Sequence, residues 1–88
     1  MPEDQEQLLD FYSNSVSFQV TAYDVMITFA ITTEPGKPPK PLVRIRMSPQ
    51  HALVMAKLFE RNMLAYRENI GKINLPPRLY QDLGLEVE

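Results

Sequence analysis

The sequence contains no cysteine and only one histidine, His51, and these shortages exclude several kinds of site. Without cysteine there is no disulfide framework, no thiolate zinc site and no cysteine nucleophile, and the composition suits a reducing compartment. A single imidazole cannot form a histidine-rich metal site within one chain. Long apolar runs are also lacking, although a membrane-spanning helix needs about 20 mostly apolar residues. We therefore expect no bound metal and no association with a membrane.

Glycine is scarce, and the sequence lacks the glycine-containing motifs of common catalytic sites. The three glycines are explained by one turn and two helix ends: Gly36, Gly71 and Gly84. The sequence has no glycine-rich phosphate loop and no nucleophile elbow. His51 has no cysteine or serine beside it in a catalytic pattern, and we interpret it as structural. We expect no catalytic residue and no cofactor, so the sequence does not indicate an enzyme.

The length and charge favour a small protein that associates. The chain has 88 residues, with 44% hydrophobic and 23% charged, which is typical of one folded domain. A core this small is marginal without help from another chain. Acidic residues gather at the two ends, so residues 11–85 carry nine basic against five acidic side chains, a charge of +4. The acidic start is unlike a signal peptide, and we expect a cytoplasmic location.

Three segments show the alternation of β-strands. Residues 15–20 place Val16, Phe18 and Val20 on one side, and residues 25–31 alternate in the same way. Residues 42–47 form the third predicted strand. Between the second and third strands, residues 34–41 hold four prolines and a glycine, which we interpret as a stiff connector outside the sheet. These patterns predict an antiparallel sheet with one apolar face and one Thr/Ser/Arg face.

A long helix is predicted to follow the sheet. Ser48 is a suitable N-cap, Pro49 suits the first helical position, and Gly71 marks the end. Residues 74–83 predict a short final helix or an extended tail. The expected fold class is therefore α+β, a three-stranded antiparallel sheet packed against one long helix. We divide the chain into an acidic lead-in (1–11), a single α+β domain (12–73) and a C-terminal docking tail (74–88).

The predicted helix has more apolar surface than one sheet can cover. One stripe, which we expect to face the sheet, contains Ala52, Met55, Ala56, Phe59, Met63, Tyr66 and Ile70. A second group extends the apolar arc to about 200°. It consists of the apolar residues Val54, Leu58 and Ala65, together with Asn62 and Asn69, which lie between these residues and the first stripe. Because a contiguous apolar patch usually marks a contact, we expect this second group to form an oligomer interface.

A basic cluster suggests a different kind of function. Arg44 and Arg46 alternate onto the polar face of the sheet, and Lys37 and Lys40 are close in sequence. With Tyr12 or Tyr23 they could form a basic and aromatic platform that binds RNA or single-stranded DNA. The same charges would also keep an ordinary sheet edge soluble and unpaired. Nucleic acid therefore remains the alternative partner.

Several landmarks together resemble a known family. They are Tyr12-Ser-Asn14, Phe18-x-x-Thr21-x-Tyr23-Asp24, Val43-Arg-Ile-Arg-Met-Ser-Pro-Gln-His-Ala52, and Lys57-Leu58 with Asn62, Tyr66 and Gly71. Over residues 12–73 the chain is similar to a family of short prokaryotic proteins known only as domain of unknown function 3467. The resemblance implies a prokaryotic, soluble protein with three strands followed by a helix. It supplies no catalytic residue, cofactor or ligand.

These observations lead to one expected function and one alternative. We expect a small interaction protein that forms a homodimer or a higher homo-oligomer, or that serves as a subunit of a larger assembly with another protein. The alternative is a nucleic-acid-binding protein that uses Lys37, Lys40, Arg44 and Arg46.

Overall fold

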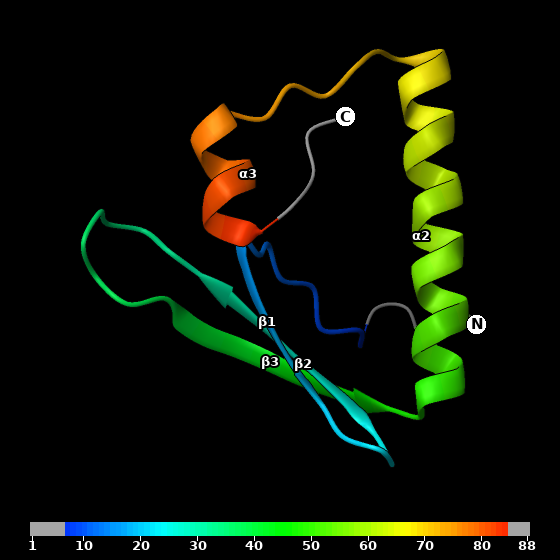
Figure 1. The fold of residues 1–88 in the computed structure, drawn as a ribbon. Coiled ribbons are helices and arrows are strands. Elements are labelled where there is room, and N and C mark those ends of the chain that lie inside the picture. The colour runs from blue at the N-terminus through cyan, green and yellow to red at the C-terminus, as the bar shows by residue number, and fades with distance from the viewer. Residues whose placement is uncertain (1–6, 85–88) are drawn as a thin grey trace. The chain divides into compact units, whose positions relative to one another are not determined.

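The structure is a computed structural model that describes residues 7–84, apart from the side chain of Tyr80. Its elements follow one another as β1 (Ser15–Val20), β2 (Val25–Ile31), β3 (Lys40–Met47), α2 (Pro49–Asn69) and α3 (Pro77–Leu83) (Figure 1). The chain divides into two compact units between Leu53 and Val54, and each unit is described separately below. The predicted α+β class, with three strands, one long helix and a short C-terminal helix, is confirmed.

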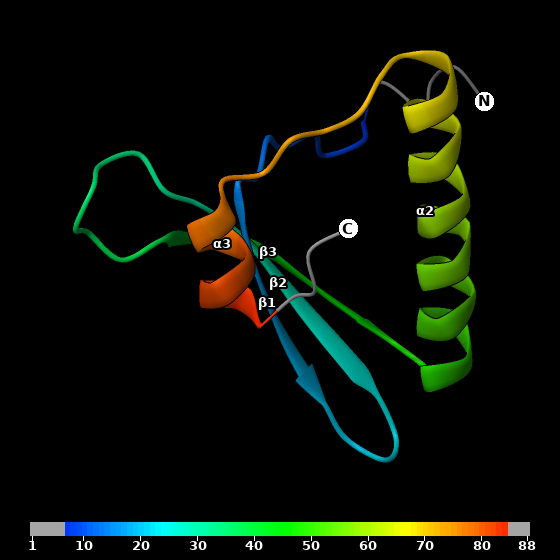
Figure 2. The same cartoon turned by 45° about the horizontal axis from the view of Figure 1, so that its top comes forward.

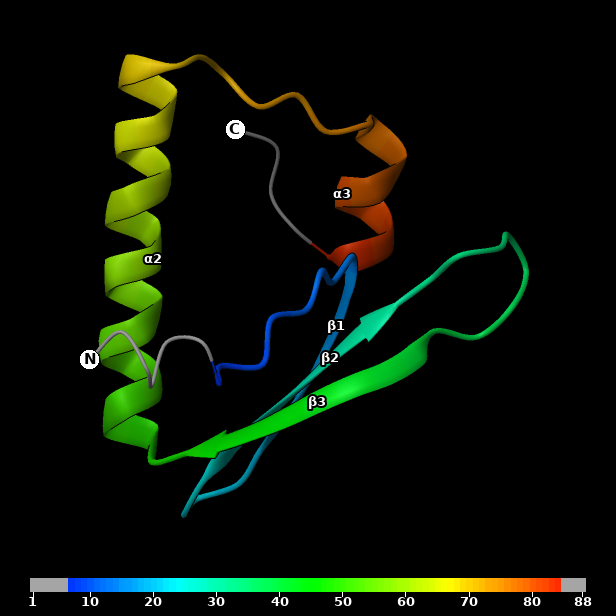
Figure 3. The same ribbon diagram turned by 180° about the vertical axis from the view of Figure 1, so that it is seen from behind.

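The sheet is an antiparallel meander in the order β1-β2-β3, with β2 in the centre (Figure 3). Its register aligns apolar residues in three rows across one face. The rows are Val16–Phe29–Val43, Phe18–Ile27–Ile45 and Val20–Val25–Met47. The central strand is the best covered, since Val25, Ile27 and Ala30 are buried. The predicted apolar face of the sheet is thus confirmed by the register.

A threonine organises the turn between β1 and β2. The Thr21 hydroxyl accepts hydrogen bonds from the backbone N–H groups of Tyr23, at 3.2 Å, and Asp24, at 3.1 Å. It also lies 2.8 Å from Asp24 Oδ1, to which it donates. These bonds stabilise the turn, although it lacks the Asn-Gly or Asp-Gly dipeptide that is typical of tight hairpins. Tyr23 is left at the tip of the turn with 89% of its surface exposed.

The third strand begins earlier than the sequence predicts. The register pairs Lys40 with Ile31 and Pro41 with Ala30, so the last residues of the proline-rich segment do join the sheet. A β-bulge between Phe29 and Ala30 accommodates them. Proline is tolerated there because β3 is an edge strand, where a missing N–H group need not break a ladder hydrogen bond. The remaining loop extends beyond the ends of β2 and β3 (Figure 2).

The bounds of α2 follow from its terminal residues. The Ser48 hydroxyl accepts a hydrogen bond from the His51 backbone N–H at 3.1 Å, which makes Ser48 the N-cap as predicted. At the other end, the Tyr66 carbonyl accepts bonds from Ile70 N–H, at 2.8 Å, and Gly71 N–H, at 3.1 Å. Gly71 has a φ of 152°, which glycine adopts more easily than other residues. No residue of α2 is buried, and its packing against the sheet stays a prediction.

Candidate interaction surfaces

The five residues predicted to form an oligomer interface lie on one face of α2, which we call the interface face: Val54, Leu58, Asn62, Ala65 and Asn69. Their spacing of three and four residues places them one above another along the helix. All five are exposed. Val54 keeps 53% and Leu58 44% of its surface accessible. The interface face is therefore accessible along its whole length.

Two asparagines on this face are held by the helix itself. Asn62 Nδ2 donates to the Leu58 carbonyl at 2.7 Å, and Asn69 Nδ2 donates to the Ala65 carbonyl at 2.9 Å. Each bond runs from residue i to residue i−4, so both side chains lie along the helix surface. The Oδ1 atoms remain as acceptors one heptad apart. Polar residues at this spacing can fix the register between two helices.

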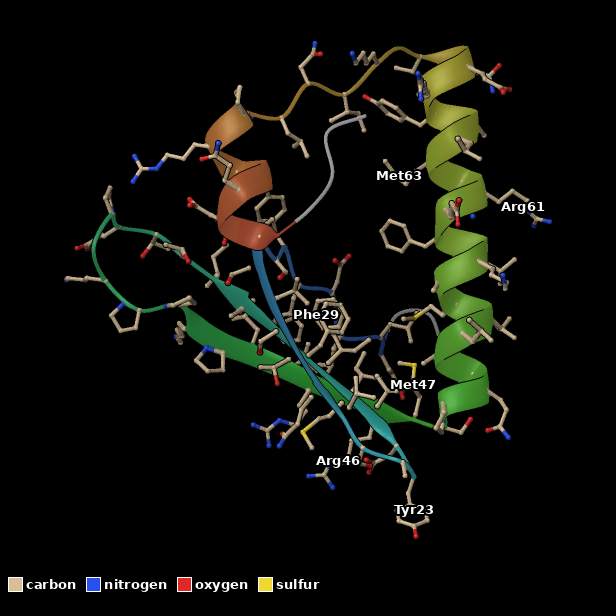
Figure 4. The ribbon with its side chains drawn as sticks, in the orientation of Figure 1. Tyr23, Phe29, Arg46, Met47, Arg61 and Met63 are labelled. Atoms are coloured by element: carbon tan, nitrogen blue, oxygen red, sulfur yellow. The ribbon has the colours of Figure 1, made fainter. Side chains whose placement is uncertain are left out.

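The rest of α2 also exposes apolar side chains. Phe59, which the sequence places on the stripe facing the sheet, is 64% exposed, and Ile70 on the same stripe is 71% exposed. Arg61 and Met63 leave α2 on different sides (Figure 4). Arg61 belongs to a polar strip that also contains Lys57 and Glu68. Leu64 lies beyond that strip from the interface face and is 50% exposed. The apolar surface of α2 therefore extends well beyond one stripe.

The structure brings together two of the four predicted basic residues. The polar face of the sheet has the rows Ser17–Thr28–Arg44 and Gln19–Met26–Arg46. Arg44 Nε donates to Thr28 Oγ1 at 3.3 Å, which holds one guanidinium against the face. Arg46 projects to the side of the sheet opposite Phe29 and Met47 (Figure 4). These two rows contain no acidic residue.

The two lysines lie elsewhere. Lys37 Nζ forms an ion pair with Glu34 Oε2 at 2.8 Å inside the connecting loop, so its charge is already matched. Lys40 pairs with Ile31, which belongs to the apolar face. The cause is the β-bulge, because a shift of one residue moves a side chain to the other face of a strand. Arg44 and Arg46 thus form a basic pair, and Lys37 and Lys40 do not join it.

The tyrosines considered beside the basic residues are separated as well. Tyr23 lies at the tip of the β1–β2 turn, at the end of the sheet where Arg46 lies, and Tyr12 precedes β1 at the opposite end. Both are exposed. Tyr23 is therefore the tyrosine that shares an end of the sheet with Arg46.

Sequence reasoning overlooked two polar residues that complete the sheet. Thr21 organises the first turn, and Asn14 bonds through its side chain to both backbone groups of Thr32. Threonine and asparagine at strand ends are known to bond to nearby backbone, and this was the signal in the sequence. His51 contributes its backbone N–H to the helix cap. Among residues 7–84, no three His, Asp or Glu side chains gather as a metal site would require.

These features define a small α+β protein with a three-stranded meander, a long exposed helix and a short final helix. Residues 3–75 match the family model described as Protein of unknown function (DUF3467), and the chain belongs to this family. The match includes most of the acidic lead-in and the first residues of the tail. No curated protein and no solved structure matches the chain. In the part of the chain that the structure describes, no helix is both long and apolar enough to cross a membrane.

Proposed function

We propose that the protein is a self-associating interaction module, a homodimer or higher homo-oligomer that serves as a scaffold or as a subunit of a larger assembly. The observation that supports this proposal is the width of the apolar surface on α2, which exceeds the stripe that one sheet can cover. This helix has 21 residues, none of them buried, and its apolar side chains extend over more than one face. Contiguous apolar surface of this kind marks an interaction site.

The interface face has the chemistry of a helix–helix contact. Val54, Leu58 and Ala65 supply apolar surface, and full burial of a valine or leucine side chain is worth roughly 1.5–3 kcal/mol. The two asparagines then select one arrangement, because an unmatched polar group at the interface is costly. A second copy fits this face well, since it offers the same apolar residues and the same amides in a symmetric arrangement.

The proposal is tested by the molar mass in solution. Light scattering after gel filtration should give at least twice the chain mass of 10.2 kDa at micromolar concentration. Leu58→Asp should lower that mass, because it would bury an unpaired carboxylate in the interface, which costs several kcal/mol. A monomeric wild-type protein would contradict the proposal.

A matched control is available on the same helix. Leu64→Asp makes the same substitution at a leucine of similar exposure, 50% against 44%, outside the interface face. It should leave the mass unchanged, and circular dichroism should show that both variants remain helical. If Leu58→Asp keeps the wild-type mass, or if Leu64→Asp lowers it equally, the interface face is not the contact.

A second candidate function is supported by the basic pair. Arg44 and Arg46 share the polar face of the sheet with serine, threonine and glutamine, and the two rows they occupy carry no acid. Such a face could bind the phosphates of a single-stranded nucleic acid. Two arginines are few for this purpose, so we propose nucleic-acid binding as the alternative, with its test in the Discussion.

We further propose that the protein acts in the cytoplasm of a prokaryotic cell and has no enzymatic activity. Support for a reducing cellular compartment comes from the cysteine-free composition. Support for a role without catalysis comes from the exposure of His51, because catalytic side chains usually lie in clefts. Incubation of purified protein with panels of common substrate classes would test the second point.

A further inference from the structure

The two edges of the sheet differ in chemistry. The outer strand β3 carries Lys40, Pro41, Arg44 and Arg46, and lysine, arginine and proline are the residues that natural edge strands use to prevent pairing. The other outer strand, β1, has the sequence SVSFQV, with no charged residue and no proline. Five of its six residues are exposed. Within residues 7–84, one edge of the sheet is therefore protected by charge and proline, and the other, β1, has no strand paired to it.

The hydrogen-bond pattern shows which groups of β1 are free to pair. The Thr21 backbone N–H donates to the Asp24 carbonyl at 2.9 Å, and the register continues from there as Val20↔Val25 and Gln19↔Met26. In an antiparallel ladder, bonded and non-bonded pairs alternate. Thr21, Gln19 and Ser17 thus bond to β2. The N–H and C=O groups of Val16, Phe18 and Val20 point to the open edge.

We propose that β1 pairs with β1 of a second copy, antiparallel and across a twofold axis at Phe18, to form a continuous six-stranded sheet. In this arrangement Phe18 lies opposite its own copy, and Val16 lies opposite Val20. The three outward-facing residues of each copy then form bonded pairs. On the other face of the sheet, Ser17 lies opposite Gln19.

An antiparallel register centred on Phe18 matches the two faces of β1 and also pairs all three of its outward-facing residues, whereas a shift by two residues keeps the faces matched but leaves one of the three without a partner in β1. Apolar residues meet apolar residues on one face, and serine meets glutamine on the other. A shift by one residue would place Phe18 opposite a polar residue. The apolar face of one copy would then adjoin the polar face of the other. The exposed side chains of Val16, Phe18 and Val20, at 50%, 64% and 68%, would gain apolar neighbours across the new seam.

Charge identifies a second copy of β1 as the occupant. Pairing of β3 with its own copy would bring Arg44 and Arg46 toward the same arginines, and like charges on facing strands are destabilising. Pairing of β1 with β3 of another copy would leave one open edge on each side and continue into a fibre. Pairing of β1 with itself uses the uncharged edge of the sheet formed by the described residues and closes after two chains.

This surface is separate from the interface face on α2, and it goes beyond the proposed function. If both contacts form, Leu58→Asp should leave a dimer held by β1, with the mass of two chains. If β1 does not pair, Leu58→Asp should give a single chain mass of 10.2 kDa. The two proposals can therefore fail independently.

The absence of cysteine in the chain allows a direct test of the register. Ser17 and Gln19 would face each other as a non-bonded pair with Cα atoms about 4.5 Å apart, within disulfide reach. Two copies of the same residue would lie diagonally, about 7–8 Å apart. A mixture of Ser17→Cys and Gln19→Cys chains should therefore form a disulfide under mild oxidation. Each variant alone should react slowly.

Tyr23→Cys provides the control for chance encounters, because Tyr23 is 89% exposed at the turn and outside the proposed seam. A paired strand holds its cysteines at an effective concentration in the millimolar range. At micromolar chain concentration, the mixture should link roughly 100-fold faster than Tyr23→Cys. The same rate should be found in the Leu58→Asp background.

Three results would overturn the proposal. The mixture could link no faster than the Tyr23→Cys control, as expected if the edge is unoccupied or receives a strand from another protein. Ser17→Cys alone could link as fast as the mixture, which would mean a different register. The fast linkage could also disappear in the Leu58→Asp background, which would make it a consequence of the contact at α2.

Discussion

Asn14 and Thr32 are joined by two hydrogen bonds that use the asparagine side chain in place of a strand backbone. Asn14 Oδ1 accepts from the Thr32 N–H at 2.7 Å, and Asn14 Nδ2 donates to the Thr32 carbonyl at 2.9 Å. The Asn14 backbone N–H bonds to the Ala30 carbonyl at 3.2 Å. Asn14 thus extends the hydrogen bonding between β1 and β2 beyond their terminal pair, Ser15 and Ala30.

Asn14→Ala should lower the free energy of unfolding by about 1–2 kcal/mol, because both bonds are lost and each contributes about 0.5–1.5 kcal/mol. Asn14→Asp is the matched variant, since it keeps the acceptor and loses the donor. It should fall between wild type and Asn14→Ala. Urea denaturation at one fixed chain concentration measures all three, because association changes the apparent stability. Equal stability of the three proteins would contradict this role.

Ser48→Ala should also destabilise the chain, by about 1 kcal/mol, because it removes the acceptor for the His51 N–H at the start of α2. Ser48→Asp keeps an acceptor at the cap and adds a negative charge at the helix N-terminus, which is favourable. It should retain wild-type stability or exceed it. Thermal unfolding followed by helical circular dichroism compares the three proteins. A Ser48→Asp protein as weak as Ser48→Ala would show that the cap is not what the serine contributes.

Asn62→Leu together with Asn69→Leu should strengthen self-association and reduce its specificity. Each replacement removes a polar group from the interface face, and such groups fix register at a cost in stability. The expected result is dissociation at lower concentration and a broader distribution of masses in sedimentation velocity experiments. Asn74→Leu, in the exposed segment before α3, is the control and should leave both properties unchanged. Weaker association of the double variant would show that the amides are attractive contacts.

The nucleic-acid alternative predicts salt-dependent binding. If Arg44 and Arg46 contact phosphates, binding of a single-stranded oligonucleotide should weaken steeply as salt rises, with a slope set by the phosphates neutralised. Replacement of both by Ala should reduce that slope by about 1–2. Replacement of Arg61 and Arg67 on α2 by Ala removes the same charge and should not change it. Fluorescence anisotropy measures the binding. No binding at low salt would remove this alternative.

The sequence was sufficient for the elements that depend on local chemistry. Alternation gave all three strands, and Ser48 and Gly71 marked the ends of α2 within about two residues. These features could be predicted because capping and alternation are read from neighbouring residues alone.

The positions that depend on pairing could not be predicted in the same way. Lys40 and Pro41 belong to β3 because of a bulge opposite Phe29 and Ala30, and no neighbour of Lys40 in the sequence signals that shift. The bulge also decides which basic residues share a face. The open edge at β1 was missed for a similar reason. The lack of charge in β1 indicates a pairing edge only once β1 is known to be an outer strand. The comparison with the charged outer strand β3 also requires the order of the strands.

The meander topology described for the sheet also has a consequence for the order of folding. Each strand pairs with the strand next to it in sequence, from Val20↔Val25 outward and then between β2 and β3. Short sequence separation keeps the entropy of loop closure small and favours fast folding. During synthesis, residues 15–47 precede α2 in the chain and so leave the ribosome before the helix does. In a nascent chain, β1 and β2 could then pair before α2 has emerged from the ribosome.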